Sequence, residues 1–144
     1  SLVRELLEQK ELSNANTLMK DLKVDSCEQR TMAECFKLFD VIHQITDSIP
    51  VIRRATCEVI KSYAQDNALY LELRSTPRQL KNSTSGDYVE ALLAGIADAR
   101  QGGCDLQTNL LLSINRTKPL HEAQEAVRLA KQYKDRGVVG VELS

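Results

Sequence analysis

Residues with the types and spacing for chemistry are concentrated in one short stretch, Tyr70 to Arg78, which reads YLELRSTPR. In its first part leucines alternate with tyrosine, glutamate and arginine, which is the pattern of a strand with one apolar and one polar face. Pro77 has no N–H for a sheet ladder, so we expect the strand to lead directly into a loop. The expected apolar face comprises Leu69, Leu71 and Leu73, and the polar face Tyr70, Glu72 and Arg74.

The charged residues of this stretch fit two interpretations. In the functional one, Arg78 presents its guanidinium in a loop after a strand, where it can bind an anionic ligand through two parallel hydrogen bonds. In the structural one, the stretch is a solvated strand end with a Glu–Arg pair. The spacing alone agrees with both.

The other candidates for chemistry are two histidines and four cysteines. His43 is expected on the apolar face of a helix, where a lone histidine is usually a core residue. His121 beside Glu122 resembles a metal-binding pair only superficially, because an exposed pair of this kind on a helix is more often solvated surface. No C-x-x-C spacing occurs, so the cysteines are interpreted as reduced thiols. They are Cys27, Cys35, Cys57 and Cys104.

Length and composition restrict the class of protein. The chain has 144 residues, the size of one domain, and a formal net charge of −1. It therefore has no basic field to attract nucleic acid or an anionic membrane. No apolar run approaches the ~20 residues of a transmembrane helix, and no signal peptide opens the sequence. We expect a cytoplasmic protein with neither a nucleic-acid partner nor a membrane partner.

Three helices are predicted in residues 1–66. The first runs from Leu2 to about Glu11, and residues 12–30 are interpreted as a loop. A capping box at Thr31–Glu34 begins the second helix, and Ser48–Pro50 begins the third. The expected apolar faces are Leu2, Leu6 and Leu7 on the first helix, Met32, Cys35, Phe36, Phe39, Ile42 and His43 on the second, and Ile52, Ala55, Val59 and Tyr63 on the third.

Strands and helices are predicted to alternate in residues 67–144. Strands with apolar runs that are separated by helices favour a parallel sheet, buried on both faces and joined by right-handed crossovers. After the strand at Tyr70, the expected order is a loop at 75–86, a helix from Asp87 and Glu90 to Gly102-Gly103, a strand from Thr108 to Ile114, a helix from near Pro119 to Arg136 closed by Gly137, and a strand from Val138 to Leu143.

The third strand ends where the sequence ends. Three parallel strands leave two open edges, which natural folds avoid. A complete (β/α) barrel has eight strands and about 250 residues. We therefore interpret the chain as a fragment. The alternative is a small three-stranded α/β domain.

Three motifs together resemble the adenosine deaminase family, and they follow its order and approximate spacing. The resemblance covers nearly the whole chain and is weakest over residues 1–30. The Ser75-Thr76-Pro77-Arg78 loop and the Ile42-His43-Gln44 stretch favour the adenosine deaminase-like branch, which deaminates N6-methyl-AMP. The three motifs are Thr31–Phe36 (TMAECF), Tyr70–Arg78 (YLELRSTPR) and Gly137–Ser144 (GVVGVELS).

The resemblance implies a fold class and a reaction. The fold class is α/β, an incomplete TIM-type (β/α) barrel with about three parallel strands and flanking helices. Residues 1–144 would form part of one deaminase domain, with a helical segment at 1–66 and the alternating segment at 67–144. The reaction is hydrolysis of the N6 amino or methylamino group of (N6-methyl-)AMP or adenosine, giving an inosine-type product. A zinc-bound water attacks C6, because zinc lowers the pKa of that water.

The family's metal ligands and its catalytic Glu, His and Asp are implied to lie outside this chain. The ligands are a His-x-His pair, a later His and an Asp. Glu72 and Glu142 lie within strands and are not the family's catalytic Glu. The 144 residues alone are therefore predicted to be inactive, and zinc belongs to a complete, monomeric parent enzyme. Two other interpretations are a catalytically inactive truncated product that acts as a binding or interaction module, and an unrelated scaffold of helices around a small sheet.

The resemblance also implies a substrate site for a purine nucleotide or nucleoside. We expect Arg78 and the hydroxyls of Ser75 and Thr76 to hold the 5′-phosphate, together with His43. Asn115 follows the second strand, where the branch generally has Asp, and Glu142 stands where the family often has Asp. The expected substrate-binding residues are His43, Ser75, Thr76, Pro77, Arg78 and Asn115.

Overall fold

A computed structural model describes residues 2–9, 31, 39–40 and 42–144. The chain divides into two compact units, Ser1–Asp47 and Ser48–Ser144, and each is described by itself. The predicted division into segments 1–66 and 67–144 follows secondary structure rather than contacts, and it stays a prediction.

The first unit contains α1 (Leu2–Gln9) and a helical stretch at 39–40 and 42–45. Leu6 and Leu7 are buried, which confirms the apolar side predicted for α1. In the second stretch Ile45 is fully buried, whereas Phe39 and His43 are exposed. His43 is two positions from Ile45, which places it on nearly the opposite side of a helix. The prediction of His43 and Phe39 on an apolar face is therefore wrong.

Several predictions for the first unit concern residues that the structure does not describe. They are the loop at 12–30, the capping box after Thr31, and Met32, Cys35 and Phe36 on the second helix.

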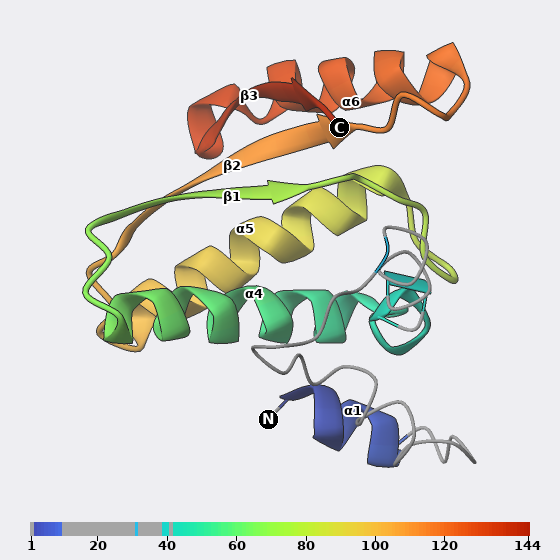
Figure 1. Cartoon of the computed structure of the whole chain (residues 1–144). Coiled ribbons are helices and arrows are strands. Elements are labelled where there is room, and N and C mark those ends of the chain that lie inside the picture. The colour runs from blue at the N-terminus through green and yellow to red at the C-terminus, as the bar shows by residue number, and fades with distance from the viewer. Residues whose placement is uncertain (1, 10–30, 32–38, 41) are drawn as a thin grey trace. The chain divides into compact units, whose positions relative to one another are not determined.

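The second unit contains a three-stranded parallel sheet of order β1-β2-β3 (Figure 1). The three parallel strands and the order of elements agree with the prediction. The elements are α4 (Ile49–Gln65), β1 (Tyr70–Ser75), α5 (Ser85–Gln101), β2 (Gln107–Ile114), α6 (Leu120–Gln132), the 3₁₀ turn η1 (Lys134–Arg136) and β3 (Val138–Leu143).

Helix α4 packs along α5 through a face that differs from the predicted one (Figure 1). Its buried residues are Ile52, Thr56 and Ile60, whereas Val59 and Tyr63 are 38% and 48% exposed. The prediction of these last two on the inner face is therefore wrong. The cause lies in α5, where the absence of a side chain at one glycine lets α4 approach.

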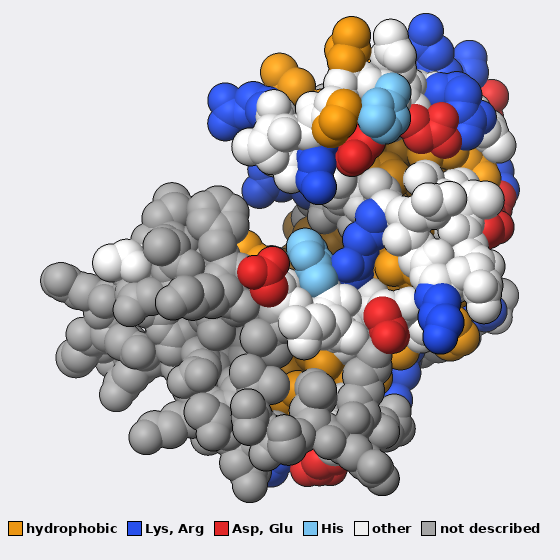
Figure 2. Space-filling view, turned by 90° about the vertical axis from the view of Figure 1, so that its right-hand side faces the viewer, with side chains coloured by type: hydrophobic (Ala, Val, Ile, Leu, Met, Phe, Trp, Pro, Cys, Tyr) orange, Lys and Arg blue, Asp and Glu red, His pale blue; other side chains and the backbone are white. Residues whose placement is uncertain are grey.

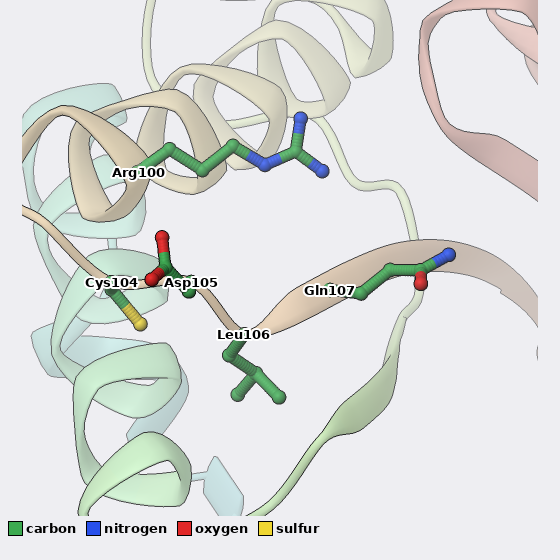
Figure 3. Close-up of a pocket in the computed structure, with 5 residues that line it drawn as sticks. All are labelled: Arg100, Cys104, Asp105, Leu106 and Gln107. Carbon is green, nitrogen blue, oxygen red and sulfur yellow. The ribbon is translucent and has the colours of Figure 1, made fainter.

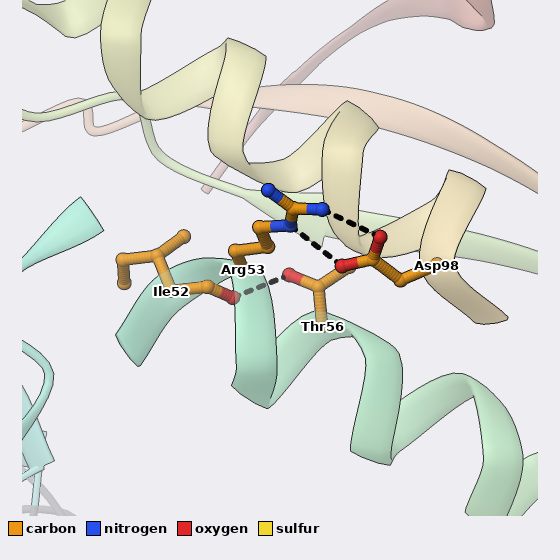
Figure 4. Close-up of polar contacts among 4 residues, drawn as sticks. All are labelled: Ile52, Arg53, Thr56 and Asp98. Carbon is orange, nitrogen blue, oxygen red and sulfur yellow. Dashed lines mark hydrogen bonds and ion pairs between the residues drawn. The ribbon is translucent and has the colours of Figure 1, made fainter. Parts of the chain in front are cut away.

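That glycine is Gly95, and a Cβ placed on it would lie 2.5 Å from the carbonyl oxygen of Arg53 and 2.6 Å from the Cβ of Thr56. The Thr56 hydroxyl donates to the Ile52 carbonyl at 2.9 Å, so it is satisfied within its own helix. At the rim, the guanidinium of Arg53 donates two hydrogen bonds of 2.6 Å to the Asp98 carboxylate (Figure 4). The two helices are thus in contact through backbone and small side chains, with one ion pair at the edge.

The ends of two helices differ from the predicted ones. Helix α5 begins at Ser85, because Thr84 is the N-cap and Asp87 is its reciprocal partner in a capping box. The predicted start at Asp87 is therefore a few residues late. Helix α6 ends at Gln132 rather than near Arg136, since the chain tightens into η1 before the left-handed Gly137, whose φ is +107°.

The two faces of the sheet are covered differently. One face packs its aliphatic side chains into the core formed with α5 and α6. The other face carries polar side chains, and β1 alternates between exposed and half-buried positions. The prediction of strands buried on both faces is therefore wrong. Leu69 is also misassigned, because it precedes the ladder and is 88% exposed. The polar face carries Tyr70, Glu72, Arg74, Asn109, Ser113 and Glu142.

Candidate functional site

The candidate site is the edge of the sheet at which the three parallel strands end. Ser75 ends β1 level with Leu112 of β2. The Ser144 N–H donates to the Ile114 carbonyl at 3.0 Å, so the ends of β2 and β3 are adjacent. In (β/α) folds the loops after the strands build the binding site. Figure 2 views the side toward which β1 and β2 point in Figure 1, and basic and acidic side chains are interspersed there.

The Ser75–Arg78 loop leaves β1 as the sequence predicts. The strand ends at Ser75, and residues 76–80 have no regular structure. Thr76 is exposed, whereas Pro77 and Arg78 are half-buried. The predicted hydroxyls and the guanidinium therefore belong to one short segment at the carboxyl edge.

Tyr88 connects two members of this loop, and the sequence analysis did not identify it. Its phenol oxygen lies 2.9 Å from the Ser75 Oγ, and its ring centroid lies 5.8 Å from the guanidinium carbon of Arg78. Tyr88 is on the first turn of α5 and is 6% exposed. Its place in the apolar pattern of α5 indicates only a core residue. The available signal was its hydroxyl, since a buried tyrosine usually finds a hydrogen-bond partner.

Asn115 lies directly after β2, as predicted, and its side chain is partly engaged. The amide oxygen accepts hydrogen bonds from the backbone N–H of Thr117 at 2.9 Å and from the Thr117 hydroxyl at 2.8 Å. This turn leaves the NH₂ group of Asn115 as its means of contacting a ligand. Asn115 can therefore donate to an acceptor at this edge.

An ion pair crosses the polar face of the sheet close to the same edge. Arg74 donates to the Glu142 carboxylate at 2.8 Å, and the Ser113 hydroxyl donates to it at 2.7 Å. The hydrogen bond from Arg74 has the larger effect and the one from Ser113 the smaller, and both hold the pKa of Glu142 below its ordinary value. Glu142 is therefore charged at neutral pH and ties the strands together rather than supplying a proton.

The structural interpretation expected a Glu–Arg pair at this strand end, and Arg74 does form one, although its partner lies outside the Tyr70–Arg78 stretch. Glu72 instead accepts a hydrogen bond of 2.7 Å from the Tyr70 hydroxyl. Glu142 lies 68 positions away in the sequence from Arg74, so no local spacing could identify the pair. The sheet brings these side chains together because both point to its polar face, where Arg74 on β1 reaches across β2 to Glu142 on β3.

The predicted residues divide between the two units. Ser75, Thr76, Pro77, Arg78 and Asn115 belong to Ser48–Ser144, whereas His43 belongs to Ser1–Asp47, where it is exposed. The interpretation of His43 as a buried core residue is therefore wrong. Its grouping with Arg78 around one ligand stays a prediction.

A cavity of about 320 Å³ occurs at the other edge of the sheet (Figure 3). Gln107 is the first residue of β2, so this cavity lies at the amino end of that strand. The loops there are not the ones that build binding sites in (β/α) folds. Its lining residues are Arg100, Cys104, Asp105, Leu106 and Gln107.

The described residues do not fit a metal centre. In the part of the chain that the structure describes, no three His, Cys, Asp or Glu side chains gather as a metal would require. His121 and Glu122 are exposed at the start of α6, and Cys57 and Cys104 are free thiols. Within the same described ranges, no helix has the length and apolar character needed to cross a membrane.

The fold and the candidate site define part of an α/β barrel enzyme fold with a ligand site at the carboxyl ends of its strands. A model of the adenosine deaminase family matches residues 5–144. The chain belongs to the adenosine deaminase family, which confirms the resemblance found in the sequence.

Individual proteins that are similar to this chain have names more specific than that of the family. The chain is 41% identical over 125 residues to N6-methyl-AMP deaminase-L of Xenopus laevis, covering 84% of this chain and 36% of that protein. It is 40% identical over 126 residues to N6-methyl-AMP deaminase of Mus musculus, covering 84% of this chain and 35% of that protein. The chain thus spans about a third of the length of these relatives.

Solved structures of similar proteins agree with membership of the adenosine deaminase family. An ADAL-IMP complex superposes with a TM-score of 0.84 at 31% identity, covering 99% of this chain and 43% of that one. Arabidopsis N6-mAMP deaminase MAPDA superposes with a TM-score of 0.83 at 35% identity, covering 99% and 44%. Arabidopsis ADAL in complex with GMP gives a TM-score of 0.83 at 33% identity, covering 99% and 43%. These matches confirm the predicted fold, an incomplete TIM-type barrel with three parallel strands and flanking helices.

Proposed function

We propose that this chain supplies the 5′-phosphate-binding part of a zinc-dependent purine deaminase. The proposed substrate is (N6-methyl-)AMP, and the product is of the inosine type. Adenosine, which has no phosphate, is the alternative substrate of such a deaminase. One observation carries the proposal: Ser75 ends β1 at the carboxyl edge of the sheet, Thr76 and Arg78 follow it, and Tyr88 contacts both Ser75 and Arg78. Relatives named N6-methyl-AMP deaminase and structures that contain IMP or GMP support a nucleotide as the ligand.

Each residue has a role that its chemistry supports. The Arg78 guanidinium can donate two parallel hydrogen bonds to phosphate oxygens. The hydroxyls of Ser75 and Thr76 can each donate one, and the NH₂ group of Asn115 can donate to the ribose or base. Pro77 fixes the backbone between the hydroxyls and the guanidinium. His43 is proposed as a further ligand contact on the strength of the family resemblance.

Zinc enters the proposal only through the family. Among the described residues no three possible ligands gather as a metal would require. The role proposed for the residues of the candidate site is to bind and orient the substrate. The proposed parent is a monomeric, cytoplasmic enzyme of nucleotide metabolism that takes a small molecule as its partner. The segment alone is expected to be inactive.

A deamination assay on N6-methyl-AMP, with the product followed by HPLC, tests the proposal. The 144-residue chain is compared with the same chain extended at both ends into the flanking reading frame. N6-methyladenosine, which lacks the phosphate, serves as the second substrate. We expect activity only in the extended protein and a lower KM for the nucleotide. No activity in either protein would favour a non-enzymatic binding module, and equal KM values would contradict phosphate recognition.

A further inference from the structure

Tyr88 contacts the candidate loop in two ways. Its phenol oxygen is 2.9 Å from the Ser75 Oγ, and its ring is 5.8 Å from the guanidinium carbon of Arg78. We propose that Tyr88 is a positioning residue that orients the Ser75 hydroxyl and the Arg78 guanidinium toward a 5′-phosphate. This inference rests on the proposed function. Because Tyr88 is 6% exposed, it acts through these two neighbours.

The chemistry of the ligand sets the direction of the Tyr88–Ser75 hydrogen bond. Either hydroxyl can donate, according to the geometry. A phosphate dianion only accepts hydrogen bonds, so Ser75 has to donate its single proton to it. Ser75 must then accept from Tyr88 through its oxygen. The phenol proton therefore fixes the rotation of the serine hydroxyl and leaves the serine proton directed at the ligand.

The aromatic ring acts on Arg78 in a different way. A guanidinium within about 6 Å of a ring centroid is attracted to the face of the ring. An arginine side chain has many rotamers, and ordering it when a ligand binds opposes the binding free energy. The ring restricts Arg78 beforehand, so less freedom is lost when the phosphate binds.

The position of Tyr88 is set by the start of α5 rather than by the loop. Thr84 Oγ1 accepts a hydrogen bond from the Asp87 N–H at 3.1 Å, and the Asp87 carboxylate accepts one from the Thr84 N–H at 2.7 Å. This capping box fixes the turn that carries Tyr88. The next residue, Val89, is fully buried in the core. Tyr88 is thus held in place by a packed helix, and through its two contacts it restricts the side chains of the loop.

Two substitutions in the extended protein separate the two contacts. Tyr88→Phe removes the hydroxyl and keeps the ring, and we expect it to raise the KM for N6-methyl-AMP roughly three- to ten-fold, as for one lost hydrogen bond, with kcat unchanged. Tyr88→Leu removes both contacts and should raise this KM further. Neither should change the KM for N6-methyladenosine, because that substrate has no phosphate.

Tyr133→Phe is the matched control. Tyr133 is also a buried tyrosine, 5% exposed, with the guanidinium carbon of Arg136 at 5.4 Å from its ring centroid. It follows α6, outside the candidate loop. Its substitution should leave the ratio of the two KM values as in the wild type.

A double-substitution cycle tests whether Tyr88 acts through Ser75. Ser75→Ala removes the donor to the phosphate, so adding Tyr88→Phe should then change the nucleotide KM little. Effects that multiply would overturn the inference. If Tyr88→Phe raised the KM for both substrates alike, the inference would also be overturned. The same holds if the wild type prefers the nucleotide and Tyr88→Phe leaves its KM unchanged. Both outcomes would leave the proposed function standing. A wild type without that preference would reject both.

Discussion

The α4–α5 interface and the Ser75–Arg78 loop are held in place by different means. At the interface, Gly95 lets the backbone of α4 come so close that even a methyl group at position 95 would overlap it. In the loop, one tyrosine contacts two side chains: the Ser75 hydroxyl lies at hydrogen-bond distance from it, and the Arg78 guanidinium carbon lies 5.8 Å from its ring centroid. The interface depends on close packing, which tolerates little change in volume. The loop depends on polar contacts that also suit a ligand.

This difference separates stability from binding. A change at the interface should reduce the free energy of unfolding, whereas a change in the loop should alter binding and leave stability nearly unchanged. Substrate sites of (β/α) barrels show the same division, with function in the loops and stability in the scaffold.

The largest effect is expected for Gly95→Ala. The added methyl would overlap the Arg53 carbonyl oxygen at 2.5 Å and the Thr56 Cβ at 2.6 Å, and backbone atoms cannot rotate away. Overpacking of this kind destabilises by about 1–3 kcal/mol or more. Urea unfolding of the 144-residue chain followed by circular dichroism would measure it. Gly102→Ala, with its nearest contacts at 3.4 Å, is the control and should cause a much smaller loss. Equal losses in the two variants would contradict this account of the interface.

For Arg78→Ala we expect the opposite, a large change in substrate binding and a small change in stability. Losing charge-assisted hydrogen bonds to a phosphate should raise the KM for N6-methyl-AMP in the extended protein by roughly ten- to a hundred-fold. Because Arg78 is half-buried and lies over the Tyr88 ring, the free energy of unfolding should fall by only about 0.5–1 kcal/mol, less than for Gly95→Ala. Arg128→Ala is the matched control, because Arg128 pairs with Glu125 on the exposed surface of α6. An unchanged KM in Arg78→Ala would remove the main support for phosphate binding.

The sequence was sufficient for the fold where local pattern decides the structure. The strand Val138–Leu143 was predicted with both ends correct, because Gly137 and an apolar run mark it. The buried face of α4 was predicted correctly at Ile52 but not beyond it, since Val59 and Tyr63 are more apolar than Thr56. The decisive feature is Gly95 on another helix, and no spacing within α4 encodes that contact.

The candidate site shows the same limit. The place of Ser75, Thr76 and Arg78 at the end of a strand was predictable because the strand pattern runs into Pro77, whereas their role in binding stays a prediction. Tyr88 was not predictable as part of the site, because within α5 it follows the core pattern of its neighbours. The partner of Arg74 was missed for a related reason: Glu142 becomes its neighbour only when β3 joins the sheet.

The smallest expected effect concerns the Arg74–Glu142 pair, which links β1 to β3 close to the loop. Its hydrogen bonds hold the pKa of Glu142 below the ordinary value of 4.5. The unfolded chain therefore binds a proton more readily than the folded one. The stabilisation is complete above pH 4.5 and is lost as pH falls through the lower folded-state pKa.

Other carboxylates also lose stabilisation in acid, since the pKa values of Asp98 and Glu90 are lowered by hydrogen bonds from Arg53 and Arg136. The test is therefore a difference in slope. Urea midpoints measured between about pH 6 and about pH 3 should fall less steeply for Glu142→Gln than for the wild type. Glu122→Gln, on the exposed start of α6, should follow the wild type. The difference should be modest and should shrink in high salt, because the Arg74 side chain is 64% exposed. A Glu142→Gln slope as steep as that of the wild type would mean that this pair contributes to the geometry of the edge but not to its stability.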